Sequence, residues 1–190
     1  MPRWFNTAGP CQEDIHYTLS PSLRLPSLER LIAQRNYFVI HAPRQIGKTT
    51  AMLALAQQLT ESGKYTAVVL SVEVGAPFSD DIARAETAIL SSWRSAAQVY
   101  LPPELRPPEQ QGMVVGQGIE ETLRQWAQTS PRPLVVLIDE IDSLQNDMLL
   151  SVLRQLRNGY PSRPGAFPQS VGLIGLRDVR DYKVAAGGSD

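Results

Sequence analysis

The sequence predicts a three-layer α/β/α fold built on a parallel sheet. Three observations predict it: short apolar runs alternate with helical patterns, a glycine-lysine-threonine loop joins one such run to the helix after it, and polar clusters follow the carboxyl ends of the predicted strands. Alternating strands and helices form β-α-β units with right-handed crossovers, and ligands bind at the carboxyl ends of their strands.

The first helix and strand precede the glycine-lysine-threonine loop. Residues 26–35 place three apolar side chains on one helical face, and Ser27 is expected to cap that helix. Residues 37–42 form a short apolar run with aromatic and β-branched side chains, which is typical of a buried strand. Residues 49–63 repeat apolar side chains along one stripe, and Gly63 is expected to end this helix.

The middle of the chain continues the alternation. Residues 66–74 predict a second buried strand. A long helix is expected to begin at residues 79–81, Ser-Asp-Asp, because acidic side chains favour the positive end of a helix, and to run toward Tyr100. The proline-rich segment 100–112 is predicted to be an exposed loop. The inward face of the long helix carries apolar side chains at helical spacing: Ile82, Ala85, Ile89, Trp93 and Ala97.

The last part of the chain contains two more helix-strand pairs. Residues 119–128 predict a helix whose inward face includes Trp126. Residues 133–142, the most apolar run of the chain, predict a strand that ends in three acids. Residues 148–159 predict a helix closed by Asn158-Gly159, and residues 170–178 predict a fourth strand after a loop rich in proline and glycine.

The segment HAPRQIGKTT, residues 41–50, matches the phosphate-binding pattern G-x-x-x-x-G-K-[ST] except that Ala42 replaces the first glycine. Gly47 lies where the main chain must approach the phosphates and a side chain would intrude. Because the first position only starts the turn out of the strand, the methyl group of Ala42 is expected to fit there. The loop follows a predicted strand and opens a predicted helix, which is the context that a nucleotide-binding loop requires.

The residues of this loop have distinct expected contacts with a nucleotide. Lys48 can reach the β- and γ-phosphates, Thr49 can place its hydroxyl on Mg²⁺, and Thr50 can touch the α-phosphate. Main-chain N–H groups at the start of the following helix converge on phosphate oxygens. The predicted nucleotide-binding residues are Ala42, Pro43, Arg44, Gln45, Ile46, Gly47, Lys48, Thr49 and Thr50.

The acids at the end of the strand 133–142 are candidates for metal binding and catalysis. Asp139 would hold Mg²⁺ opposite Thr49, commonly through a water molecule. Glu140 would orient and deprotonate a water that attacks the γ-phosphate. The alternative is that these acids cap the next helix, and for Asp142 the two interpretations carry equal weight.

Together these motifs resemble those of P-loop ATPases of the AAA+/STAND type. NTAGP, HAPRQIGKT, LIDEID and GLRDVRDY are similar in combination to a group of bacterial and archaeal ATP-binding proteins with an AAA-like domain, over about residues 5–182. The resemblance implies an ATPase core at 37–182, after an N-terminal arm and helix at 1–36 and before a flexible tail at 183–190. It also implies that the strand ending at residues 174–176 lies between the lysine strand and the acid strand.

The resemblance assigns further site residues. Arg177 would sense the γ-phosphate as a third catalytic residue beside Lys48 and Glu140, and the alternative is a solvated charge cluster, RDVRDYK. Tyr17 and residues 6–10 would contact adenine, with a packing role weighted equally. An arginine finger supplied by a neighbouring subunit has several candidate donors: Arg154, Arg157, Arg163 and Arg180.

Such domains usually continue into a fifth strand and a small helical lid, whereas this chain stops twelve residues after Asp178. Without a fifth strand, the lysine strand would form an exposed edge of the sheet. The fold is therefore expected to be truncated before these elements, or to have that edge covered by another element.

Composition places the chain among ordinary globular proteins, and its 190 residues can form one sizeable core. The net charge of −1 favours neither nucleic acid nor an anionic membrane. No apolar run approaches the roughly 20 residues that cross a bilayer, and the N-terminus has no signal-peptide core. The single cysteine, Cys11, fits a reducing compartment, so a cytoplasmic location is expected.

The leading prediction is an enzyme, a domain that binds ATP and hydrolyses it with Mg²⁺ and acts as a nucleotide-driven switch or motor module. Its expected partners are ATP, an unidentified protein or missing C-terminal domain, and, as one option, further copies of the chain. One alternative is an interaction scaffold that responds to ATP without hydrolysing it, and another is a P-loop kinase that phosphorylates a small acceptor. ATP is favoured over GTP by the resemblance and by the lack of an N-K-x-D motif.

Overall fold

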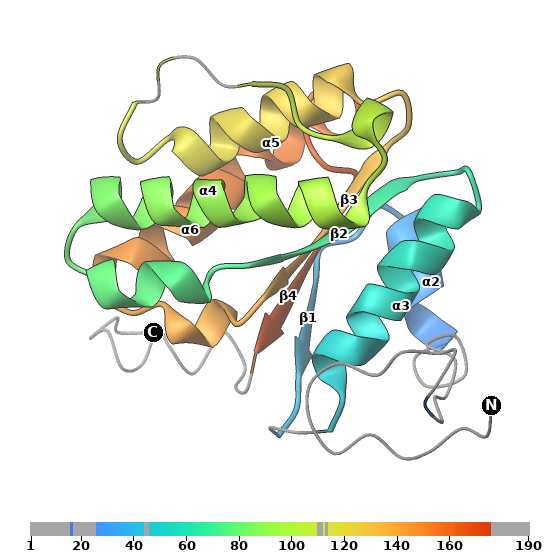
Figure 1. Ribbon diagram of the computed structural model, residues 1–190, viewed down its shortest axis with the longest axis horizontal. Helices are drawn as coiled ribbons and strands as arrows, with labels where there is room; N and C mark the ends of the chain where they lie inside the picture. Colours follow the sequence, from blue (N-terminus) through green and yellow to red (C-terminus); the bar gives the residue numbers. More distant parts are fainter. Residues whose placement is uncertain (1–15, 17–25, 44–45, 110–111, 113, 176–190) are drawn as a thin grey trace.

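The computed structural model describes residues 16, 26–43, 46–109, 112 and 114–175 (Figure 1). Its centre is a four-stranded sheet in the order β1-β4-β3-β2, and every pairing is parallel. The strands are β1 (Phe38–His41), β2 (Thr66–Ser71), β3 (Leu134–Asp139) and β4 (Ser170–Gly175). Strand β4 therefore lies between the lysine strand β1 and the acid strand β3, as the resemblance implied.

Within the described residues, five α-helices cover the two faces of this sheet. They are α2 (Pro26–Ala33), α3 (Lys48–Glu61), α4 (Ile82–Tyr100), α5 (Gly118–Thr129) and α6 (Asn146–Gly159). Figure 1 shows α2 and α3 on one face and α4, α5 and α6 on the other. Side chains alternate along each buried strand, so that Val69 packs with α2 and α3 while Val68 packs with α4–α6. The predicted three-layer α/β/α fold is confirmed.

The larger core lies between the sheet and helices α4–α6. Trp93 and Trp126, predicted to face inward, are 1% and 0% exposed. Their indole N–H groups donate to the carbonyl oxygens of Ser71 and Leu105, each at 2.9 Å. Burying a large apolar side chain contributes about 1.5–3 kcal/mol to stability when its polar atom keeps a partner. Trp93 therefore joins α4 to the sheet and Trp126 joins α5 to the segment Pro103–Leu105, without leaving a buried donor unpaired.

The second strand is shorter than predicted, because β2 ends at Ser71 and the 3₁₀-helix η1 (Glu73–Phe78) follows. The N–H group of Val72 donates to the carbonyl of Asp139 at 3.2 Å, and Asp139 is the last residue of β3. Beyond it the neighbouring strand supplies no further ladder partner. Pro77 lies inside η1 and has no N–H group to donate to a sheet.

Two predicted helix starts were wrong in detail. Ser27 lies inside α2, which begins at Pro26, a residue well suited to the first helical position. In α4 the cap is Asp81, whose carboxylate accepts the N–H of Arg84 at 3.1 Å. The hydroxyl of Ser79 donates instead to the carbonyl of Ala76 in the preceding turn, at 2.9 Å.

The proline-rich loop predicted to be exposed is partly core. It contains the 3₁₀-helix η2 (Pro103–Leu105), and Leu101 and Leu105 are 3% and 2% exposed. These two leucines stand among prolines without helical or strand periodicity, so the sequence pattern did not distinguish them from surface residues.

The predicted closure of α6 at Gly159 is correct in position, and the 3₁₀-helix η4 (Tyr160–Ser162) follows directly. The glycine keeps a right-handed conformation, with φ −73°. A Cβ atom at Gly159 would lie 2.2 Å from the ring of Phe167. The glycine is therefore needed for close packing against this buried ring and not for a turn. Gly63, by contrast, follows α3 with φ +75°, as expected of a helix stop.

Candidate functional site

The phosphate loop leaves the sheet at the carboxyl end of β1. Ala42 continues the pairing with β4, because its N–H donates to the carbonyl of Gly175 at 3.3 Å. Gly47 has φ +81° and ψ +29°, a left-handed conformation that L side chains rarely adopt, and α3 begins at the next residue. The loop therefore needs a glycine at position 47. Arg44 and Gln45 lie outside the described residues.

The side chain of Lys48 reaches back across this loop. Its ammonium group donates to the carbonyl oxygens of Ala42 at 2.6 Å and Pro43 at 2.9 Å. The charge is held at the start of α3, where the positive end of the helix dipole also lies. A lysine in this position is placed to exchange carbonyl oxygens for the phosphate oxygens of a nucleotide.

Thr49 and Asp139 are 90 residues apart in the sequence and in direct contact in the structure. The hydroxyl of Thr49 donates to Asp139 Oδ2 at 2.7 Å. Asp139 is only 4% exposed and ends β3, while Thr49 lies in the first turn of α3. A hydroxyl and a carboxylate are hard oxygen donors, and Mg²⁺ is usually held by one or two carboxylates together with substrate phosphates. The donor set therefore fits a magnesium ion.

Glu140 follows Asp139 with an unusual main-chain conformation. Its φ of +57° is left-handed, which costs a glutamate about 1 kcal/mol, and such strain occurs often at functional sites. The N–H of Glu140 donates to Asp139 Oδ1 at 2.9 Å and stabilises this turn. Partial burial, followed by the charges of Asp139, Asp142 and Glu73, raises the pKa of Glu140, while Lys48 acts in the opposite direction. A carboxylate with a raised pKa is a stronger base.

Asp142 lies beside the end of β4 and not at a helix cap. It belongs to the 3₁₀-helix η3 (Ile141–Ser143), and the cap position of α6 is Gln145, without a side-chain hydrogen bond. A Cβ atom on Gly175 would lie 2.7 Å from Asp142 Oδ1. That oxygen is buried and has no hydrogen-bond partner among the described residues. None of the three acids therefore caps α6, and Glu140 occupies the cap position of η3 without a side-chain hydrogen bond.

Sequence patterns did not identify Glu73 as a site residue. The predicted strand 66–74 includes Glu73. In the structure Glu73 follows β2, at the same edge of the sheet as the other acids, and its charge raises the pKa of Glu140. The signal that could have found it is the one used for Asp139, namely an acid just beyond the carboxyl end of a buried strand.

Several predicted site residues are not brought to this edge by the described structure. Arg177, Arg180, Tyr17 and residues 6–10 lie outside the described residues. Arg154 and Arg157 are exposed on α6. Arg163 lies over the rings of Tyr160 and Tyr37, with its guanidinium carbon 3.5 and 4.9 Å from the ring centroids. It also donates to the carbonyls of Arg35, Tyr160 and Gln169, so it packs at the amino ends of β1 and β4.

The comparison with known families decides the assignment. Residues 32–182 match the profile of the AAA domain. The chain belongs to the AAA domain family. The match covers the phosphate loop, the acid strand and β4, and it assigns the chain to the P-loop AAA-type ATPases. No curated protein matches the chain at a significant level.

One solved structure supports the fold of this AAA domain. A chain in the structure of Drosophila ORC bound to poly(dA/dT) DNA and Cdc6 superposes with a TM-score of 0.52 and 14% identity. The match covers 90% of the present chain and 27% of that chain. C. elegans PCH-2 gives a TM-score of 0.48 and 18% identity, over 83% of the present chain and 37% of its own. The AAA domain thus spans only about a quarter to a third of these longer chains.

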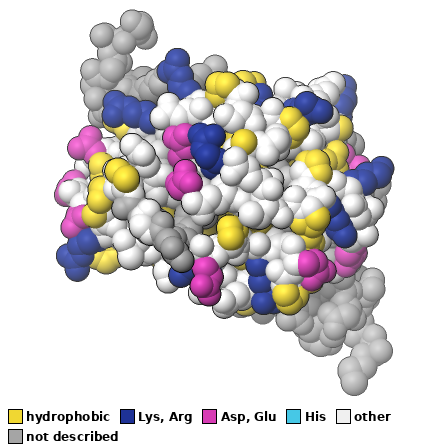
Figure 2. Space-filling view, turned by 90° about the horizontal axis from the view of Figure 1, so that it is seen from above, with side chains coloured by type: hydrophobic (Ala, Val, Ile, Leu, Met, Phe, Trp, Pro, Cys, Tyr) yellow, Lys and Arg dark blue, Asp and Glu magenta, His cyan; other side chains and the backbone are white. Residues whose placement is uncertain are grey.

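One face of the AAA domain carries mixed charge (Figure 2). On the face shown in Figure 2, Lys and Arg side chains alternate with Asp and Glu side chains, and neither sign forms a continuous patch. This distribution matches the net charge of −1. Among the described residues, no helix is long and apolar enough to cross a membrane.

Proposed function

We propose that this AAA domain binds ATP with Mg²⁺, hydrolyses it, and acts as a nucleotide-driven switch or motor module of a larger assembly. The observation that carries the proposal is the Thr49–Asp139 hydrogen bond of 2.7 Å, which joins the phosphate loop to the acid strand. Beside it lie one lysine ammonium and a strained glutamate whose pKa is raised. Chance would not bring these four groups to one edge of the sheet.

Each group has a proposed part in the reaction. Gly47 turns the main chain so that N–H groups at the start of α3 face phosphate oxygens, and Lys48 binds the β- and γ-phosphates. Thr49 and Asp139 would hold Mg²⁺. The ion, when bound, neutralises charge on the phosphates. Glu140 orients a water and accepts its proton as the water attacks the γ-phosphate. We further propose Arg177, after β4, as the residue that stabilises the γ-phosphate charge.

The lack of a glycine at position 42 does not weaken the proposal. Ala42 still pairs with β4 through its N–H group, and its carbonyl accepts the Lys48 ammonium. Both of these contacts of residue 42 use main-chain atoms, which an alanine supplies as well as a glycine. The left-handed turn falls on Gly47 alone among the described loop residues.

The binding step is tested by titrating a fluorescent ATP analogue into the full chain with Mg²⁺, beside Lys48→Ala. Removing the ammonium should weaken binding roughly 10- to 100-fold, because a hydrogen bond to a charged group is worth about 1.5–3 kcal/mol. Lys64→Ala, an exposed lysine just after α3, makes the same chemical change away from the site. Equal affinity of the Lys48 and Lys64 variants would refute the proposed site.

The alternative function is an interaction scaffold that binds ATP without hydrolysing it. The ammonium, hydroxyl and carboxylate groups that bind nucleotide would be the same, so binding data do not separate the two functions. Single-turnover release of inorganic phosphate from Mg-ATP does separate them. Release above the background of Glu140→Gln supports hydrolysis, whereas intact binding with no release above that background supports the scaffold.

A further inference from the structure

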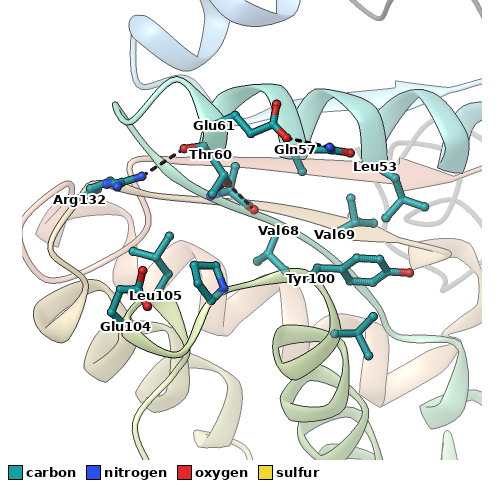
Figure 3. A pocket seen from close by; sticks show the side chains of 14 residues that line it. Leu53, Gln57, Thr60, Glu61, Val68, Val69, Tyr100, Glu104, Leu105 and Arg132 are labelled. Carbon is teal, nitrogen blue, oxygen red and sulfur yellow. Dashed lines mark hydrogen bonds between the residues drawn. The ribbon is translucent and has the colours of Figure 1, made fainter. Parts of the chain in front are cut away.

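A cavity of about 510 Å³ opens at the β2 edge of the sheet (Figure 3). One wall is the second half of α3, and the other is the end of α4 together with η2, while β2 lies between them. The phosphate loop is at the opposite end of α3, so the cavity is separate from the proposed nucleotide site. Its size lies within the range of about 300–1,000 Å³ typical of ligand sites.

Every second residue of β2 directs its main-chain groups away from β3 along this edge, and of these Ala67 and Val69 are 3% and 8% exposed. The N–H of Thr66 donates to Pro133 at 3.0 Å and the N–H of Val72 donates to Asp139 at 3.2 Å, both toward β3. In a parallel strand, successive residues direct their main-chain N–H and C=O groups to opposite sides. The main-chain groups of Ala67, Val69 and Ser71 therefore face away from β3. These are the edge groups that another chain could pair with.

Two of these three edge residues are already capped by side chains. The hydroxyl of Thr60 donates to the carbonyl of Ala67 at 3.1 Å and accepts its N–H at 3.0 Å. The indole of Trp93 donates to the carbonyl of Ser71 at 2.9 Å. Val69 lines the cavity, and no side chain or loop among the described residues forms a hydrogen bond with its outward main-chain groups. The gap in the protected edge thus coincides with the floor of the cavity.

The walls of the cavity combine exposed apolar side chains with unpaired charge. Val99 and Tyr100, at the end of α4, are 75% and 54% exposed. Glu61 and Glu104 line the same cavity, and neither forms a salt bridge with any residue that the structure describes. The lining contains these two carboxylates and a single cation, Arg132, so the cavity carries a net negative charge. Arg132 donates to the carbonyl of Thr60 at 3.1 Å.

We infer that this cavity binds a short extended peptide segment of a partner protein, one that carries a large apolar residue next to a lysine or arginine. The peptide main chain pairs with the free N–H and C=O of Val69. Its apolar side chain packs against Tyr100 and its basic side chain faces Glu61 and Glu104. An extended segment fits better than a helix, because a helix has no free main-chain groups along its side for Val69. The inference does not depend on ATP binding.

Val69 is the one edge residue of these three with neither main-chain group capped by a side chain, so the pairing centres on it, which has two consequences. Main-chain bonds alone give little affinity, so side-chain contacts must decide which peptide binds. The contact is also too small for a permanent interface and suits a transient partner.

The test uses the full ¹⁵N-labelled chain and the peptide acetyl-Thr-Val-Phe-Lys-Thr-Ser-amide. Saturable shifts are expected at the amides of Val69 and Tyr100 and not at Lys48. The same peptide with glutamate in place of lysine should bind about five- to tenfold more weakly at low salt, because attraction to two carboxylates becomes repulsion. Two further peptides carry N-methyl groups on the odd-numbered or on the even-numbered residues. Only one of them should lose the Val69 shift, because alternate residues of an extended peptide direct their N–H groups to opposite sides.

Matched variants identify the contacts. Val99→Lys and Glu104→Lys should each weaken binding several-fold, whereas Val114→Lys and Glu109→Lys make the same changes at exposed positions outside the cavity lining and should not. The inference is overturned if neither peptide produces a saturable shift, if both bind equally, or if the shifts lie elsewhere. It is also overturned if Val99→Lys dissociates a dimer of the unliganded chain, since the cavity would then be a contact between copies.

Discussion

Glu86 and Glu140 differ in the burial and hydrogen bonding of their carboxylates. Glu86, in α4, is 3% exposed, and its two oxygens accept the N–H of Gly116 and the amide of Gln155, each at 2.7 Å. Glu140, after β3, is partly exposed, and its carboxylate accepts no hydrogen bond from the described residues. The first carboxylate is fully used by the fold, and the second is left available to a substrate.

The difference extends to the surroundings of each carboxylate. Gln155 also accepts the N–H of Glu120 at 2.9 Å, so the Glu86 network joins α4, α5 and α6 through neutral donors. Around Glu140 the neighbours include three further acids, which raise its pKa and destabilise its charge. Like charges held together lower stability, and such groups are a mark of sites where charge is needed for chemistry. Two variants test this comparison, and a third extends it to a buried hydroxyl that has no hydrogen-bond partner among the described residues.

Glu140→Gln should have the largest effect. Loss of the proposed base should lower the rate of ATP hydrolysis by about 10²–10⁴-fold while Mg-ATP affinity changes only a few-fold. Single-turnover phosphate release and nucleotide titration measure the two quantities. Glu109→Gln, at an exposed glutamate away from the site, is the matched control. A Glu140→Gln variant that hydrolyses ATP at the normal rate would remove the proposed base.

Glu86→Ala should have a smaller effect, and on a different quantity. It leaves the N–H of Gly116 and the amide of Gln155 without their acceptor, so the free energy of unfolding should fall by about 1–3 kcal/mol. Urea unfolding measures this loss, with Glu109→Ala as the control. Hydrolysis per folded molecule should stay unchanged. If instead hydrolysis fell at unchanged stability, the distinction between the two glutamates would fail.

Tyr37→Phe should have the smallest effect at neutral pH. The Tyr37 hydroxyl is buried without a hydrogen-bond partner among the described residues, so its removal should change the free energy of unfolding by no more than about 1 kcal/mol, toward higher stability. The ring stays packed against Tyr160, with the centroids 5.0 Å apart. Destabilisation by several kcal/mol would reveal a hydroxyl partner that this arrangement lacks.

The same variant should diverge from the wild type in alkali. Burial, the largest cause, raises the pKa of Tyr37 well above its ordinary value, so the folded state keeps the proton after the unfolded chain begins to lose it near pH 10. The wild type therefore loses stability as the pH rises from about 10 toward the folded pKa, and Tyr37→Phe lacks this loss. Urea unfolding should show that the difference in the free energy of unfolding between the two proteins is larger at pH 10.5 than at pH 7. A constant difference would contradict the assignment.

Local patterns predicted most of the elements. The four strands came from short apolar runs, and the two inward-facing tryptophans from helical spacing. The errors fall at the ends of elements. β2 stops at Ser71 because β3 offers no partner beyond Asp139. Leu101 and Leu105 are buried because they belong to the same core cluster as Trp126, which lies on another helix. Such limits depend on neighbours in space, which periodicity does not contain.

The sequence by itself determined the phosphate-loop motif and its place between a strand and a helix, since Gly47, Lys48 and Thr49 depend only on a few adjacent residues and their turn. Only the tertiary structure decided which distant groups meet. The contact of Thr49 with Asp139 and the charge of Glu73 near Glu140 follow from the strand order β1-β4-β3-β2, which aligns the strand ends at one edge. The uncapped main chain of Val69 also depends on the tertiary structure. It follows from the position of β2 at the edge of the sheet and from which side chains cover that edge.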